Sequence, residues 1–343
     1  MEVNFLKLES RLLDLLKFGK LLFLTETEKE FDDQYQIWIK EIQTKLEPFR
    51  SQIQSFYLKD AYATQDLSHL LFNAFPIHGF DQQGYFNYIL SQNTDTLKSK
   101  LYEALVVSNQ EKVESHPNPI VFIQGLDLDN TFKWQLLLMI ENPIQTIQSF
   151  TQLMKQLEPL FNRYYDMVSS AVITLGEQMS HELLTQGSSV IETWSQGRIK
   201  GMTIEDQTLN LMITGVYQYE VMINPKKDCH NLVWGLKMKQ AFDHMSQAVE
   251  NKTSERVTVF KNLGDKTRYE VIKWISTGLT SVKEIAAKIG VSSATISYHI
   301  NELLKSKIIT LENQNKKFSY VVDYAYLNEI IDELKTDLDF PKP

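Results

Sequence analysis

Small, hydroxyl-bearing, amide and cationic side chains gather in the segment 293–305, and their types suit hydrogen bonding to a nucleic acid. Small residues let a helix approach a groove closely, and polar groups can donate to or accept from base edges and phosphates. A rotation of about 100° per residue places these residues on one side of a helix or its flank: Ser293, Ala294, Ser297, Tyr298, Asn301 and Lys305. The pattern indicates a short helix that enters the major groove of DNA.

A helix-turn-helix pattern between Thr280 and Ile309 would position this face. Ser281 precedes Glu284 by three residues, the spacing of a capping box at a helix start, and Gly290 can take the left-handed conformation that ends the helix. Ser292 can cap a second helix, 292–305. One apolar stripe on that helix would face the core: Ile296, Ile300, Leu303 and Leu304.

The flanking segments complete a small module. Upstream, 259–278 predicts two short amphipathic helices separated at Gly264, with Asp265 as a cap. Downstream, Ile308 to Val322 predicts two strands joined by the polar turn 313–316. That hairpin would be a wing beside the two helices.

The phrases LGDKTR, IAAKIGVSSATISYHI and KSKII closely resemble ArsR-type winged helix-turn-helix transcriptional regulators. The resemblance covers about the last quarter of the chain, and its one minor departure is Lys266, where the family usually has Pro. It implies helix 292–305 in the major groove and wing 311–318 on the DNA backbone. By the same resemblance, the base-reading residues are Ser293, Ala294, Ser297 and Tyr298, with Thr295 and Asn301 at the edges, and the phosphate contacts are Lys305, Lys316 and Lys317.

Several of these residues have a plainer structural interpretation. We expect Ser292 to act as a cap, Arg268 to brace the module, and His299 to be a packed, hydrogen-bonded structural histidine. Lys316 and Lys317 could also form only a solvated hairpin tip. The last helix, Tyr324 to Leu338, could pack in a dimer interface, as in related regulators, or within its own chain.

Charge separates along the chain in the way that DNA binding requires. Residues 254–322 carry eleven Lys plus Arg against six acidic residues, a net charge of +5, whereas residues 1–253 carry 22 against 31, a net of −9. An evenly acidic chain would be repelled by DNA. The basic segment coincides with the predicted DNA-binding module.

Metal sensing by the sites familiar in ArsR-type proteins is not expected. Thiolate sites need paired cysteines, but Ser281 to Ile289 contains none and the chain has a single cysteine, Cys229. The last helix contains no histidine. Cys229, His230 and His244 could bind a metal only if an unpredicted fold brought them together. We therefore expect no metal and no cofactor.

The fold class expected is mainly α with small β elements, in a chain of 343 residues. Three parts are predicted: a helical dimerisation or effector region (1–205), a strand-rich segment with a connecting helix (206–250), and the winged helix-turn-helix (254–343). Helices are expected over 31–56, 94–107, 143–157, 159–192 and 237–249, and strands over 209–215, 216–223 and 231–236.

The N-terminal region lacks the motifs of an enzyme. His181-Glu182 is not followed by the second histidine of a zinc protease, Gly187-Ser188-Ser189 lacks the flanks of a nucleophile elbow, and Asp127 to Asn130 lacks the glycine and glutamate of a calcium loop. No apolar run approaches the roughly 20 residues of a membrane span, and the start lacks a signal-type segment.

We therefore expect a cytoplasmic, dimeric repressor that binds double-stranded DNA and not membranes, with room for an unidentified small-molecule effector. Two other classes remain open: a protein-interaction scaffold whose winged module binds protein, and an effector-binding, enzyme-like domain fused to a DNA-binding module.

Overall fold

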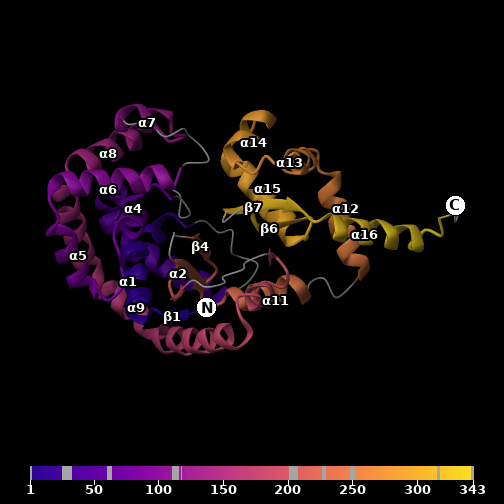
Figure 1. Cartoon of the computed structure of the whole chain (residues 1–343), viewed down its shortest axis with the longest axis horizontal. Coiled ribbons are helices and arrows are strands. Elements are labelled where there is room, and N and C mark those ends of the chain that lie inside the picture. Colours follow the sequence, from indigo (N-terminus) through magenta and orange to yellow (C-terminus); the bar gives the residue numbers. More distant parts are fainter. Residues whose placement is uncertain are drawn as a thin grey trace.

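The computed structural model describes residues 2–24, 33–59, 64–109, 116, 118–200, 208–225, 229–247, 252–314 and 317–340. Figure 1 shows a large group of N-terminal helices on one side and the C-terminal helix-turn-helix module on the other. The fold is mainly α-helical with two small sheets, as the sequence predicts. Among the described residues, no helix is both long and apolar enough to cross a membrane.

A large apolar core holds most of the N-terminal helices together. The helices of this region are α1 (Lys7–Phe18), η1 (Gly19–Phe23), α2 (Asp33–Leu46), η3 (Glu47–Phe49), α3 (Arg50–Gln54), α4 (Leu67–Ala74), α5 (Gln82–Leu90), α6 (Thr94–Val107), α7 (Pro119–Gly125), α8 (Asn130–Glu141), α9 (Pro143–Gln186) and α10 (Val190–Trp194). A second, smaller core lies between the end of α9, α10 and the strand-rich segment.

Helix α9 runs without a break through Pro159, so the predicted division into two helices at this residue is wrong. A proline inside a helix removes one backbone hydrogen bond and costs about 3 kcal/mol. Leu157 and Phe161, on either side of Pro159, are completely buried in the core. Burial of this apolar face offsets the cost of the proline.

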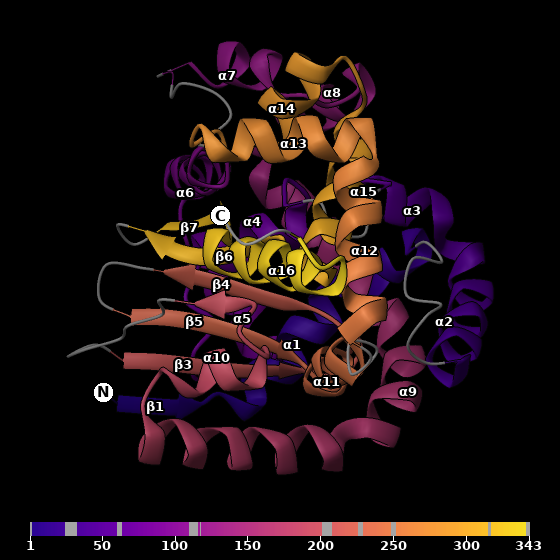
Figure 2. The same cartoon turned by 90° about the vertical axis from the view of Figure 1, so that its right-hand side faces the viewer.

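A four-stranded sheet lies against α9, in the order β1-β3-β5-β4 (Figure 2). Its strands are β1 (Glu2–Phe5), β3 (Thr208–Thr214), β4 (Val221–Pro225) and β5 (Cys229–Gly235). Strands β1, β3 and β5 are parallel, and β4 is antiparallel to β5. The sequence did not predict β1, through which the first residues of the chain join the strand-rich segment.

The predicted strand over 216–223 is mostly wrong, because residues 216–220 form a turn before β4. The buried carboxylate of Asp14 accepts hydrogen bonds from the backbone N–H groups of Gly215 and Val216. Thr214 Oγ1 accepts another from the N–H of Tyr217 at 2.9 Å. These contacts hold the backbone in a turn instead of an extended strand.

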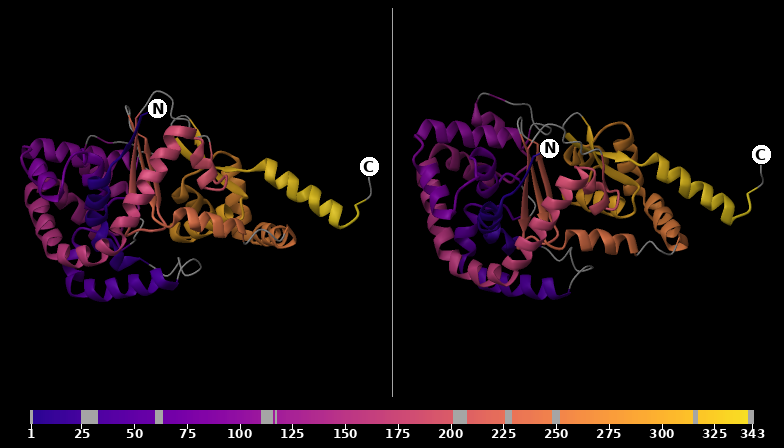
Figure 3. Two further views of the ribbon diagram at one scale, coloured as in Figure 1. Left: turned by 90° about the horizontal axis from the view of Figure 1, so that it is seen from below. Right: turned by 60° about the horizontal axis from the view of Figure 1, so that its bottom comes forward.

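The C-terminal module has its own apolar core. It consists of α12 (Lys252–Gly264), α13 (Lys266–Ser276), α14 (Val282–Ile289), α15 (Ser293–Lys305), β6 (Ile309–Gln314), β7 (Lys317–Val322) and α16 (Tyr324–Asp337), and it follows α11 (Met238–Gln247). The helices and the hairpin occur in the predicted order. Figure 3 shows α16 projecting away from the N-terminal helices.

The backbone pairing of one short strand is among the contacts that join the two parts, as is the hydrogen bond that Lys283 Nζ donates to the carbonyl of Gly125 at 3.5 Å. Strand β2 (Ile199–Lys200) lies in the N-terminal region but pairs in parallel with β6, so the hairpin belongs to a three-stranded sheet of order β2-β6-β7. Strand β2 was not predicted, because two residues are too few to show the alternation of apolar and polar side chains that is typical of a strand.

Candidate nucleic-acid interface

Side-chain caps set the two helices of the turn. The hydroxyl of Ser281 accepts a hydrogen bond from the N–H of Glu284, and that of Ser292 accepts one from the N–H of Thr295. Gly290 between them has a φ of 81°, in the left-handed region that a side chain disfavours. The predicted caps and turn residue are confirmed, and together they end α14 and start α15.

The face of α15 that turns away from the core is exposed and carries several small side chains. Ala294, Ser297, Tyr298 and Asn301 are exposed, whereas Ser293 and Thr295, in the first turn, are half-buried. On the opposite side Ile296, Ile300 and Leu303 lie in the core of the module. The structure thus brings the predicted helix residues together on one accessible surface.

Ser292 and Thr295 are linked to each other in the first turn of α15. Besides its cap, the Ser292 hydroxyl lies 2.8 Å from the hydroxyl of Thr295, and either can donate. Ser292 is therefore a cap, as expected, and Thr295 already uses part of its hydrogen-bonding capacity within the helix. Ser297, Tyr298 and Asn301 are the exposed polar residues of this face.

Tyr298 is 53% exposed and lies beside a braced arginine. The guanidinium carbon of Arg268 is 5.8 Å from the centroid of the Tyr298 ring. Arg268 also donates to Oδ1 of Asn262 at 2.6 Å, and its Nη2 lies 3.9 Å from a carboxylate oxygen of Glu302. Arg268 connects the α12–α13 corner to α15, which is the bracing role expected from its position.

Lys305 lies near the end of α15 and is half-buried. Its ammonium group forms an ion pair with Glu302 at 3.0 Å. Glu302 was not among the predicted site residues, although its spacing of three residues from Lys305 is one that lets side chains meet on a helix. This carboxylate lies between two cations of the module, Lys305 and Arg268.

His299 packs beside Tyr298, with ring centroids 5.4 Å apart. It is half-buried, and burial lowers the pKa of its imidazole below the usual value. Its Nδ1 atom is buried and has no hydrogen-bond partner among the described residues. The expectation of a packed histidine is therefore met, but the expected hydrogen bond at Nδ1 is not.

The hairpin after α15 is antiparallel, with Gln314 paired to Lys317 next to its tip. Lys316 lies outside the described residues, and of Lys317 only the backbone is described, so the predicted phosphate contacts at the tip stay predictions. Tyr320 and Val322 of β7 pack toward the core of the module. The hairpin follows α15 directly, and its first strand, β6, contacts that helix.

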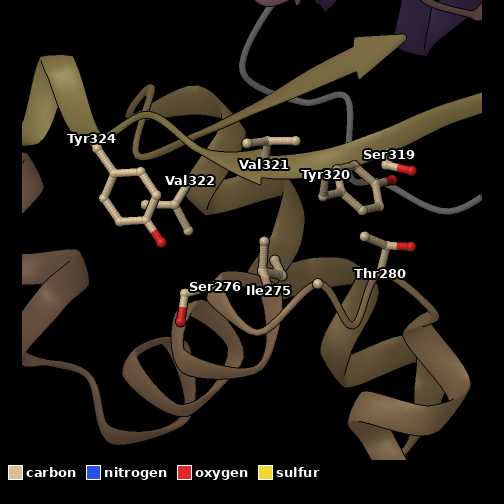
Figure 4. Close-up of a pocket in the computed structure, with 9 residues that line it drawn as sticks. Ile275, Ser276, Thr280, Ser319, Tyr320, Val321, Val322 and Tyr324 are labelled. Atoms are coloured by element: carbon tan, nitrogen blue, oxygen red, sulfur yellow. The ribbon is translucent and has the colours of Figure 1, made fainter. Parts of the chain in front are cut away.

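A cavity of about 210 Å³ lies between the end of α13 and strand β7, away from α15 (Figure 4). Apolar groups of Ile275 and Val322 and hydroxyl-bearing residues such as Thr280 and Ser319 line it, and no charged side chain does so. It is separate from the exposed face of α15.

In the described part of the chain, no group of three or more His, Cys, Asp or Glu residues is placed so that it could hold a metal ion. Cys229 and His230 begin β5. Glu182 accepts a hydrogen bond from the indole of Trp194 at 2.6 Å, which gives it a structural role beside exposed His181.

Comparison with known proteins agrees with the module. The model of a family described as a helix-turn-helix domain matches residues 263–312. Over 80 aligned residues the chain is 28% identical to the arsenical resistance operon repressor of Staphylococcus aureus. The aligned stretch covers 23% of this chain and 77% of that repressor. No solved structure matches the chain. The C-terminal quarter is a helix-turn-helix module, and both similarities support a general role in DNA-binding regulation of transcription.

Proposed function

We propose that this chain is a dimeric, sequence-specific DNA-binding repressor of transcription that reads the major groove with α15 and touches the DNA backbone with the β6–β7 hairpin. The observation that carries the proposal is the exposed face of α15. It combines small residues in its first turn with exposed hydroxyl, phenol and amide groups further along.

The order of these residues along α15 suits entry by its N-terminal end. Ala294 and Ser293 leave little bulk where the helix would come closest to the bases. Tyr298 and Asn301 follow one and two turns later on the same side. The amide of Asn301 can pair with adenine in a bidentate manner, and Ser297 can donate or accept at either base of a pair.

Electrostatics support the same surface. Phosphate contacts dominate affinity for DNA and make it depend on salt. In the free chain Glu302 lies within ion-pairing distance of Lys305. A DNA phosphate would compete with Glu302 for this ammonium group, which would reduce the contribution of Lys305 to affinity.

A dimer is supported by apolar side chains that the chain itself leaves uncovered. Helix α16 packs on α12 through ion pairs of Arg256 with Glu333 and Asp337, at 2.8 and 2.7 Å. Beyond that contact, Ile331 and Leu338 of α16 are exposed. Two copies joined there would present two α15 helices to half-sites roughly 34 to 36 Å apart.

The N-terminal region would carry the regulatory input, and it contains no enzyme in this proposal. An unidentified small molecule is the simplest effector. A repressor must be in the same compartment as the DNA that it binds. We therefore propose that the protein is cytoplasmic.

Selection of DNA from a random pool by the purified full-length chain tests this proposal. We expect enrichment of a palindrome, and we expect Tyr298→Ala and Asn301→Ala to weaken binding to it. Tyr269→Ala is the matched control, because Tyr269 is a similarly exposed tyrosine on α13, outside the proposed reading face. Enrichment of no sequence would contradict the proposal and favour a module that binds protein.

A further inference from the structure

Strand β2 belongs to both parts of the molecule at once. Ile199 is 4% exposed and lies in the apolar cluster that joins Trp194 of the N-terminal region to Trp234 and Phe242 of the strand-rich segment and its helix. The backbone of the same residue pairs with Leu311 of β6 in the hairpin sheet. One residue therefore carries packing from the N-terminal region directly into the DNA-binding module.

The residues on either side of Ile199 strengthen both attachments. The N–H of Leu311 donates to the carbonyl of Arg198 at 3.1 Å, and the ammonium group of Lys200 forms a 2.8 Å ion pair with Asp323. Asp323 is also the N-cap of α16, since it accepts a hydrogen bond from the N–H of Tyr326 at 3.0 Å. Strand β2 thus contacts the hairpin and the start of α16 together.

Arg198 anchors β2 on the other side. Its side chain is buried, its Nη1 donates to Ser246 of α11 at 3.1 Å, and its guanidinium carbon lies 5.9 Å from the centroid of the Phe242 ring. Ile199 N donates to Ser195 Oγ at 2.9 Å, which holds the start of the strand to the end of α10. A shift of α10 or α11 would therefore move β2.

We propose that β2 is the conformational link through which the N-terminal region sets the position of the hairpin and of the first turn of α16. A ligand or partner that displaces α10 and α11 would then move the β6–β7 hairpin and the start of α16 through β2. The consequence for DNA rests on the proposed function, in which the hairpin meets the DNA backbone and α16 joins two copies. The mechanical link itself does not depend on it.

Hydrogen exchange of backbone amides in the full-length chain tests the link without DNA. Lys200→Pro removes a backbone N–H and the ion pair together. We expect exchange in residues 309–314 and 317–322 to become about tenfold faster, the effect of losing one or two net hydrogen bonds. Exchange in β3 and β5 should stay unchanged, which shows that the N-terminal sheet is still folded.

Two milder variants separate the ion pair from the backbone pairing. Asp323→Asn keeps an N-cap of similar strength but removes the charge, and Lys200→Met removes the ammonium group. We expect both to speed exchange in the hairpin and at the start of α16 by a few fold. The matched control is Lys335→Met, which breaks the 2.7 Å ion pair with Asp332 on the outer part of α16. It should leave the hairpin unchanged.

The most decisive experiment changes a residue on α11, on the side of β2 that faces away from the hairpin. Phe242 lies on α11 and packs against the guanidinium group of Arg198. We expect Phe242→Leu to loosen this packing and to speed amide exchange in the hairpin, although Phe242 lies outside the hairpin. In the Lys200→Pro background the same substitution should add nothing, because the link is already broken.

The inference is overturned if Lys200→Pro leaves hairpin exchange unchanged while β3 and β5 stay protected. It is also overturned if Phe242→Leu acts equally in both backgrounds. If exchange responds as expected but affinity for the selected DNA does not change in Lys200→Pro, the link stands and the proposed backbone contact of the hairpin fails.

Discussion

The guanidinium carbon of Arg268, in the first turn of α13, lies 5.8 Å from the centre of the Tyr298 ring on the exposed face of α15. A cation over an aromatic face stabilises a particular ring position. The proposed reading tyrosine is thus oriented by a residue that is tied to Asn262 and close to Glu302.

Arg268→Lys should weaken binding to the selected DNA by about two- to fivefold, the equivalent of losing a cation–π contact of about 0.5 to 1 kcal/mol. Lysine keeps the charge but cannot reproduce the planar guanidinium and its hydrogen bond to Asn262. Fluorescence anisotropy with labelled DNA measures the change. In the Tyr298→Ala background the substitution should have little further effect, and two fully additive losses would show that Arg268 does not act through Tyr298.

Glu302→Gln should raise affinity for DNA by a few fold and steepen its dependence on salt. The substitution removes a negative charge beside Lys305 and Arg268, which raises the positive potential that the module presents to a phosphate in the proposed complex. Lys305→Ala should lower the salt slope by about one.

Glu270→Gln is the matched control for the charge effect. It removes a similar carboxylate that lies 3.3 Å from Lys273 on α13, outside the proposed DNA surface. Equal effects of the two glutamine variants would mean that only the net charge of the module matters, and that Lys305 has no specific contact.

Gly290→Ala should lower the free energy of unfolding of the module by about 1 kcal/mol, because its φ of 81° is a conformation that alanine disfavours. Gly264→Ala provides the contrast. Gly264 ends α12 without a positive φ, and a Cβ there would meet open space. Urea denaturation should show Gly264→Ala to be neutral or slightly stabilising, and a similar loss at both glycines would contradict the assigned turn.

Asp14 should make stability depend on pH. Burial raises the pKa of its carboxyl to about 7, against the opposing effects of hydrogen bonds from Thr214 and Gly215 and of the charge of Lys17. Because the folded pKa lies above the ordinary value of 3.8, the folded state binds the proton more tightly. This contribution to stability is complete below about pH 4 and is lost as the pH rises through 7.

The variant Asp14→Asn isolates that contribution. The free energy of unfolding of the wild-type chain should fall by up to about 4 kcal/mol between pH 4 and 8 from this group, the equivalent of a shift of about three pKa units. Asparagine cannot ionise, so the variant should lack this part of the slope. An unchanged slope, measured by urea denaturation across the pH range, would assign the dependence to other groups.

The C-terminal module could be predicted because its signals are local. Asp265, Ser281 and Ser292 each cap a helix by accepting from a backbone N–H three residues later. Gly290 ends its helix through its own backbone conformation. An apolar stripe on α15 then determines which face is exposed. No distant residue is needed for these assignments.

The N-terminal region was harder to predict because distant residues decide its structure. The turn at 216–220 is held by Asp14, some two hundred residues away. Strand β1 forms only because β3 lies beside it, with Phe5 paired to Leu211. Helix α9 continues through Pro159 because its neighbours are buried by other helices.

The candidate site also has one part that local sequence patterns predict and one part that depends on distant residues. The exposed residues of α15 follow from helical periodicity, whereas the contact between Arg268 and Tyr298 joins two helices and needs the fold. Strand β2 is too short for a period, and its pairing with β6 spans more than a hundred residues. Sequence patterns therefore located the proposed reading face but not its connection to the rest of the chain.

Entry of α15 into the major groove is the central claim, and interference by modified bases tests it most directly. Replacing purines of the selected DNA with 7-deazapurines removes the N7 acceptors of the major groove and leaves the minor-groove edge intact. We predict that binding of the full-length chain is weakened at two clusters of positions about one helical turn apart. Full binding with every purine replaced would contradict the claim.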